Sequence, residues 1–177
     1  ADSSQIPTYL VAHLASQNVT VALSGDGGDE LFCGYGRYAL TERLWRHLSR
    51  LPWPIRRVLS GMIKQIEPEL WDHLLKPLPS AWRQNLHGDR IHLLAGKLLA
   101  RTGAELYLGI ISNWKDPASV VIGGSEPQET LTAFDLDLMS HMMLTDGLNY
   151  LPSDILTKVD RAARAVSLET RVPFLDH

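Results

Sequence analysis

Apolar and polar positions divide the chain into one strand-like run and a series of helix-like segments. Residues 19–23 (Val-Thr-Val-Ala-Leu) form a continuous apolar run rich in β-branched residues, which is typical of a buried strand. Elsewhere apolar residues recur every three or four positions, which predicts amphipathic helices. The predicted helices are a first one capped by Ser3 or Ser4, a short one at 29–32, and longer ones near 40–50, 55–66, 91–101, 104–111 and 136–148, with a last one capped by Ser153.

Glycine and proline separate these segments. Gly34 and Gly36 are expected to end the short helix, and residues 116–127 are the strongest predicted loop. A single predicted strand is too little for a parallel sheet, because each parallel strand needs partners. We therefore expect a piece of a larger α/β protein, predominantly helical here, with its strand near 19–23. A small all-helical domain with one edge strand is the alternative.

Composition and charge limit the classes of function that this chain can have. The 177 residues carry a net charge of −3, a single cysteine and no apolar stretch long enough to cross a membrane. We expect a cytoplasmic protein without a membrane partner. Residues 37–64 hold seven basic side chains against one acid, interleaved with Trp45 and Trp53. This block is interpreted as the solvated side of amphipathic helices rather than as a nucleic-acid surface.

An acidic, glycine-rich loop follows the predicted strand. Residues 24–30 read Ser-Gly-Asp-Gly-Gly-Asp-Glu. Ligands of open α/β sheets bind at the carboxyl ends of strands. Carboxylates beside bare backbone amides suit a metal-bound phosphate, since Mg²⁺ takes the carboxylate and the amides take oxygens. The loop lacks the Gly-Lys-Ser/Thr of a Walker loop and the glycine spacing of a Rossmann fingerprint. A solvated Gly-Asp turn is the alternative.

Two further distinctive runs lie near the C-terminal end of the chain, and a third opens it. Residues 151–161 read Leu-Pro-Ser-Asp-Ile-Leu-Thr-Lys-Val-Asp-Arg, and residues 167–176 read Ser-Leu-Glu-Thr-Arg-Val-Pro-Phe-Leu-Asp. Together with the acidic loop and the opening run at 2–8 (Asp-Ser-Ser-Gln-Ile-Pro-Thr), they closely resemble the synthetase domain of glutamine-hydrolysing asparagine synthetases. The match is dense at both ends of the chain and loose in the middle.

The resemblance implies a fold, a reaction and a set of site residues. The fold would be α/β, of the adenine nucleotide alpha-hydrolase type, with helices around a parallel sheet. In that family ATP converts aspartate to a β-aspartyl-adenylate, which ammonia then attacks to give asparagine. Ser24 and Gly25 match positions that contact ATP, and Asp29 matches the aspartate that binds Mg²⁺. Asp26 matches an acidic position linked to forming the adenylate and reacting with it, and is the expected catalytic residue.

The resemblance also implies parts that the chain lacks. We find no Ser-Gly-Gly-x-Asp-Ser pyrophosphate loop, which lies upstream in relatives, and their pyrophosphate-gripping lysine lies downstream of residues 173–176. Residues 1–177 are thus expected to be an internal part of the synthetase domain, inactive alone. Ammonia would come from a glutaminase domain of the same parent chain, and a homodimer is compatible with this arrangement.

Several other residues are expected to have structural roles, and one further stretch leaves alternative functions open. Cys33 is expected to be a packed thiol. Residues 146–150 resemble a stretch that lines the active cleft in relatives that make other amide bonds. A relative that amidates another carboxylate (of a sugar, peptide or β-lactam precursor) and a non-catalytic helical module therefore remain alternatives. Structural pairing, rather than catalysis, is expected for Glu30, Asp160, Arg161, Glu169 and Arg171.

Overall fold

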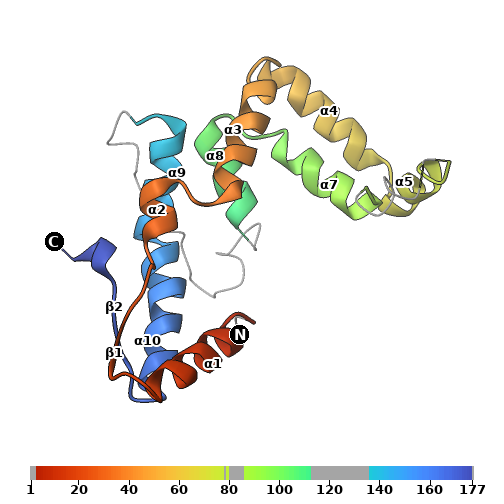
Figure 1. The fold of residues 1–177 in the computed structure, drawn as a ribbon. Helices are drawn as coiled ribbons and strands as arrows, with labels where there is room; N and C mark the ends of the chain where they lie inside the picture. Colours follow the sequence, from red (N-terminus) through yellow and green to blue (C-terminus); the bar gives the residue numbers. More distant parts are fainter. Residues whose placement is uncertain (1–2, 78, 80–85, 113–135, 177) are drawn as a thin grey trace, which may run out of the picture. The chain divides into compact units, whose positions relative to one another are not determined.

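The computed structural model describes residues 3–77, 79, 86–112 and 136–176. One unit joins residues 1–38 to residues 130–177, and a second unit holds residues 39–129. The described residues are mostly helical, with one small sheet (Figure 1). The elements are α1 (Gln5–Ser16), β1 (Val21–Leu23), α2 (Gly28–Phe32), α3 (Gly36–Leu48), α4 (Trp53–Gln65), α5 (Pro68–Leu74), α7 (Gly88–Lys97), α8 (Gly103–Ile111), α9 (Leu138–Leu148), the π-helix η3 (Leu151–Leu156), α10 (Thr157–Arg164), β2 (Glu169–Arg171) and the 3-10 helix η4 (Pro173–Leu175).

The sheet of the first unit joins two strands from opposite ends of the chain. β1 and β2 run parallel, with Val21 opposite Glu169 and Leu23 opposite Arg171 (Figure 1). The ladder continues past the strand ends, because the Ser24 N–H donates to the Arg171 carbonyl at 2.8 Å. The predicted strand is therefore confirmed, although it begins at Val21 rather than at residue 19. The expectation that it is buried is wrong, because Val21 and Leu23 are exposed and only Ala22 between them is half-buried. The strand has a parallel partner, so the alternative of a lone edge strand is wrong.

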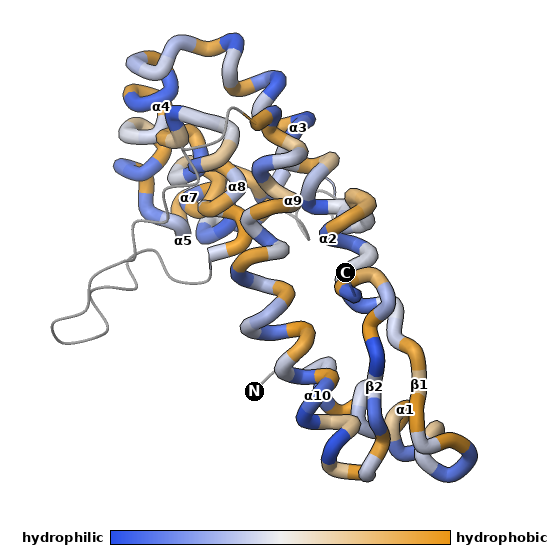
Figure 2. The backbone as a smooth tube through the Cα atoms, turned by 90° about the vertical axis from the view of Figure 1, so that its left-hand side faces the viewer, coloured by the Kyte–Doolittle hydropathy of each residue, from blue (hydrophilic) through white to orange (hydrophobic). Residues whose placement is uncertain are grey.

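β2 could not be predicted from hydrophobicity. Figure 2 shows β1 as hydrophobic and β2 as largely hydrophilic, in line with the sequences Val-Ala-Leu and Glu-Thr-Arg. β2 is also only three residues long, and its Glu169 and Arg171 side chains are exposed. A three-residue strand made of polar residues carries no apolar signal, so only its backbone pairing with β1 defines it.

Small side chains hold α1 against α10. Ala12, Ala163 and Leu168 form a buried cluster, and half-buried Ala15, Ala22 and Val166 surround it. Alanine at the contact lets helix backbones approach closely. The Lys158 ammonium adds a polar link, donating to the Ser4 hydroxyl at 2.8 Å. The opening run at 2–8 and the run at 151–161 therefore contact each other in the first unit.

The second unit is a set of packed helices in which α4 and α5 lie against α7 (Figure 1). The Ser60 hydroxyl is buried and donates to the Ala95 carbonyl at 2.7 Å, which ties α4 to α7. Gly88 begins α7 against the backbone of Pro68, where a Cβ would collide with the Pro68 carbonyl. Glycine is thus required at this close approach.

Arg56 contradicts the expectation that the basic block is simply a solvated helix face. It is 4% exposed, and its guanidinium donates to the carbonyls of Leu51 (3.1 Å), Leu98 (3.3 Å) and Ala100 (2.5 Å). The last turn of a helix leaves carbonyls without intrahelical donors. Arg56 supplies hydrogen-bond donors to carbonyls just after the end of α7. Its positive charge also interacts favourably with the negative, C-terminal end of that helix.

Several predicted helix boundaries differ from the structure, and α7, for example, spans Gly88–Lys97 rather than 91–101. Ser153 does not cap a helix, because it lies inside η3, where the chain stays helical from Tyr150 onward. Gly36 does not end the short helix either. α2 ends at Phe32 with Cys33 in the left-handed region (φ 59°), and Gly36 begins α3. The predicted loop at 116–127 lies outside the described residues.

None of the helices in the described parts of the chain is both long enough and apolar enough to cross a membrane.

Arg56 provides a stability test. Arg56→Met keeps the length of the side chain but removes its donors, so three carbonyls lose a charged partner. We expect the free energy of unfolding to fall by about 2–3 kcal/mol in a urea titration. The matched control is Arg57→Met, an exposed arginine on the same helix, for which we expect a change within about 0.5 kcal/mol. Equal effects of the two changes would contradict the capping role of Arg56.

Candidate functional site

The acidic loop leaves the carboxyl end of β1 and turns directly into α2. Gly27 makes this turn in the left-handed region (φ 84°), which a residue with a side chain rarely adopts. The Leu31 N–H then donates to the Gly27 carbonyl at 3.0 Å, which closes the first turn of α2. The strand, loop and helix predicted from the sequence are therefore present in that order.

Ser24 and Asp26 form a hydrogen-bonded pair within the loop. The Ser24 hydroxyl donates to Asp26 Oδ2 at 2.6 Å, and both residues are partly buried. This bond fixes the direction of the Asp26 carboxylate. Gly25 between them is exposed, and nothing lies within 4 Å of where its Cβ would be. A ligand can thus approach the loop backbone closely at Gly25.

Asp29 stands in the first turn of α2 with an exposed side chain. Its carboxylate folds over Gly34, and a Cβ at Gly34 would collide with Oδ1 of Asp29. The backbone follows the same contact, because the Gly34 N–H donates to the Asp29 carbonyl at 2.9 Å. Gly34 therefore provides the space that the Asp29 carboxylate occupies.

Asp29 fits a magnesium ion that is shared with a phosphate. Mg²⁺ prefers one or two carboxylates with phosphate oxygens and waters completing its shell, so one exposed carboxylate is half of such a site. Among the described residues, no three histidine, cysteine or acidic side chains gather as a complete protein cage. An exposed carboxylate such as that of Asp29 can supply one ligand to a metal whose other ligands are phosphate oxygens and waters.

Glu30 differs sharply from its neighbour Asp29. It is 4% exposed, and its Oε1 accepts a hydrogen bond of 2.7 Å from the Tyr35 hydroxyl. Burial, together with this bond to the Glu30 carboxylate, raises the pKa of Tyr35. Glu30 thus has a structural partner, as expected.

The run at 173–176 packs directly on the acidic loop. A Cβ at Gly27 would lie 2.9 Å from the Leu175 side chain, and one at Gly28 would lie 3.4 Å from the Phe174 ring. Phe174 also meets Phe32 of α2 edge to face, with ring centroids 5.6 Å apart. The two most distinctive runs of the sequence therefore form one structural site.

Sequence reasoning missed a buried cluster beside this loop. The sequence pattern predicts that Arg37 lies on a solvated basic face, yet its Nη2 lies 2.6 Å from Oδ2 of the buried Asp146. The Tyr38 hydroxyl donates to the same oxygen at 2.7 Å. The resemblance of residues 146–150 to a cleft-lining stretch was the one signal that pointed here.

The remaining structural expectations have mixed outcomes. Arg171 pairs with Glu169 at 2.8 Å, as expected. Asp160 pairs with Arg164 at 2.7 Å, one turn away, rather than with the adjacent Arg161. The packed-thiol expectation for Cys33 is wrong, because Cys33 is exposed and contacts Met143 through the two sulfur atoms at 3.1 Å.

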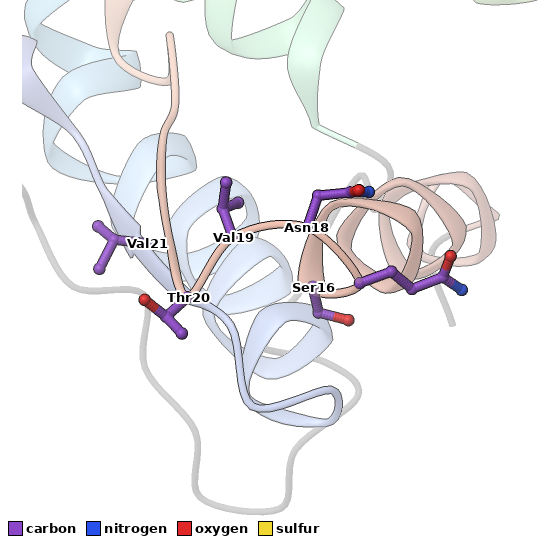
Figure 3. A pocket seen from close by; sticks show the side chains of 6 residues that line it. Ser16, Asn18, Val19, Thr20 and Val21 are labelled. Carbon is purple, nitrogen blue, oxygen red and sulfur yellow. The ribbon is translucent and has the colours of Figure 1, made fainter.

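A shallow pocket in the same unit does not belong to the candidate site. It lies where the chain leaves α1 and enters β1, at the opposite end of the strand from the acidic loop (Figure 3). Its lining residues are Ser16, Gln17, Asn18, Val19, Thr20 and Val21.

Comparisons with known proteins identify the family of the chain. The asparagine synthase family model matches residues 1–177. A Mycobacterium tuberculosis protein, provisionally named a glutamine-hydrolysing asparagine synthetase, is 33% identical over 99% of this chain and 25% of its own length. Asparagine synthetase (glutamine-hydrolysing) 1 of Bacillus subtilis is 32% identical over 99% of this chain and 26% of its own length. No solved structure matches the chain significantly.

The chain spans about a quarter of the length of these curated relatives. Because the family model covers every residue, including the acidic loop and the run that packs on it, the chain belongs to the asparagine synthase family.

Proposed function

We propose that the chain is part of an ATP-dependent synthetase domain that converts aspartate to asparagine. The observation that carries the proposal is the acidic loop at the end of β1, with Asp29 exposed over Gly34 and Gly25 open to a ligand. The names of the relatives support aspartate as the acceptor acid and glutamine as the source of ammonia. The rest of the phosphate site would come from residues outside this chain.

The proposed reaction has two steps. The β-carboxylate of aspartate attacks the α-phosphorus of ATP, which forms a β-aspartyl-adenylate and releases pyrophosphate. Ammonia then attacks the acyl carbon, and AMP leaves with the electrons of the broken C–O bond. Ser24 and Gly25 would contact the nucleotide. Asp29 would hold Mg²⁺, which when bound neutralises charge on the phosphate oxygens.

Asp26 is proposed as the catalytic carboxylate. Attack by ammonia produces a positively charged nitrogen that must lose a proton, and a fixed carboxylate within reach can accept it. The Ser24 hydroxyl engages Oδ2 of Asp26 at 2.6 Å. Oδ1 is therefore the oxygen that would take the proton, and the Ser24 bond would hold it in a constant direction.

Asp29→Asn tests the metal role. The amide keeps the shape of the side chain but loses its charge, so we expect aspartate-dependent pyrophosphate release by the full-length protein to fall on the order of 100-fold or more. The urea midpoint should barely change, because the side chain is exposed. The matched control is Asp89→Asn, another exposed acid in the first turn of a helix, which should leave activity unchanged. Full activity of Asp29→Asn would refute the metal role.

Gly34→Ala tests the same site without touching a carboxylate. The added methyl group would collide with the Asp29 side chain and push it away. We expect the half-saturating Mg²⁺ concentration of the full-length protein to rise on the order of tenfold. Gly36→Ala is the matched control, since nothing lies within 4 Å of its Cβ position. An unchanged Mg²⁺ requirement in Gly34→Ala would show that the placement of Asp29 is unimportant.

Substrate specificity has its own test. Replacing aspartate by other carboxylic acids in the pyrophosphate-release assay should abolish turnover if aspartate is the acceptor. Release of pyrophosphate with a sugar acid or a peptide carboxylate, but not with aspartate, would instead support a related amide-forming enzyme.

A further inference from the structure

A cluster of aromatic and charged side chains joins α2 to α9 within the first unit, where these helices lie against each other (Figure 1). We call it the tyrosine–arginine cluster, and its members are Glu30, Tyr35, Arg37, Tyr38, Asp146 and Tyr150.

Tyr35 lies at the centre of the cluster. Its hydroxyl donates to the buried Glu30 carboxylate at 2.7 Å. Its ring packs edge to face against Tyr38 and Tyr150, with centroids 5.6 and 6.1 Å away. The ring is therefore held from two sides while its hydroxyl holds Glu30.

Arg37 fixes the other side of the Tyr35 ring. Its guanidinium carbon lies 3.8 Å from the Tyr35 ring centroid and 4.8 Å from that of Tyr150, which are cation–π distances. The same guanidinium donates to Asp146 Oδ2 through Nη2 at 2.6 Å and through Nε at 3.2 Å. The Asp146 side chain is 1% exposed and that of Arg37 is 26% exposed, so the carboxylate end of this ion pair is shielded from water. The pair anchors Tyr35 to α9.

The short helix α2 depends on such anchors. Five residues cannot form a stable helix by themselves, since the first turn of a helix is costly to nucleate. Glu30 is covalently adjacent to Asp29 and points into the cluster, whereas Asp29 is exposed. A bond that fixes Glu30 therefore fixes the rotation of α2, and with it the direction of the Asp29 carboxylate.

We propose that Tyr35 is a positioning residue for the metal site, acting through its hydrogen bond to Glu30 to set the direction of Asp29. The inference rests on the proposed function, because it gives Asp29 the role of metal ligand. A residue that only stabilised the fold would change the unfolding midpoint without changing the Mg²⁺ requirement. A residue that orients a ligand changes the metal affinity as well.

The test removes the bond from each side in the full-length protein. Tyr35→Phe deletes the donor and Glu30→Met deletes the acceptor. We expect each change to raise the half-saturating Mg²⁺ concentration on the order of tenfold, with kcat at saturating Mg²⁺ within about twofold of the unchanged protein. If one variant does not fold, the other decides.

Two controls separate orientation from stability. Glu30→Gln keeps an oxygen that accepts from the Tyr35 hydroxyl, so its Mg²⁺ requirement should stay close to that of the unchanged protein. Thr145→Val removes a buried hydroxyl that donates to the His141 carbonyl of its own helix at 2.8 Å. It should lower stability while leaving the Mg²⁺ requirement unchanged.

The outcomes distinguish the two proposals. The positioning role is overturned if Tyr35→Phe and Glu30→Met lower stability like Thr145→Val but leave the Mg²⁺ requirement unchanged. It is equally overturned if Glu30→Gln shifts that requirement as much as Glu30→Met. If Asp29→Asn retains full activity as well, the proposed metal role of Asp29 fails. If only Asp29→Asn impairs activity, the metal role stands and the positioning role fails.

Discussion

The parallel hydrogen-bond ladder between β1 and β2 is the interaction on which the candidate site depends. It pairs Leu23 with Arg171, and the next bond joins Ser24 to the Arg171 carbonyl. The acidic loop begins at that bond, and residues 173–175 follow the other strand directly. Because parallel strands end at the same edge of a sheet, the ladder places the acidic loop and residues 173–175 next to each other. The contacts of Phe174 and Leu175 with the loop glycines follow from this arrangement.

The loop combines a fixed inner face with an accessible outer one. Glu30 points inward and is held by Tyr35, whereas Asp29 lies outside over Gly34. A buried carboxylate is costly unless it is hydrogen-bonded, so the protein must supply a donor for Glu30. Tyr35, which follows α2 in the chain, supplies that donor. Family membership and the names of relatives support the proposal that this loop serves in asparagine synthesis.

The sequence predicted the local features of the site but not its long-range ones. Residues 24–30 could be placed between a strand and a helix, because glycine spacing and a β-branched run are local signals. Residues 169–171 escaped detection as a strand, since they are polar and three residues long. The sequence pattern predicts an exposed Arg56, because an arginine that caps distant carbonyls has no local signature. The pairing of Arg37 with Asp146 spans 109 positions in the chain, and only tertiary packing reveals it.

The central claim is that Asp29 ligates a magnesium ion on the phosphates of ATP. A crystal structure of the full-length protein with Mg²⁺ and a non-hydrolysable ATP analogue tests it most directly. The account predicts a carboxylate oxygen of Asp29 about 2.1 Å from the metal, with phosphate oxygens completing the shell. An ordered nucleotide and metal with Asp29 turned away and hydrated would contradict it.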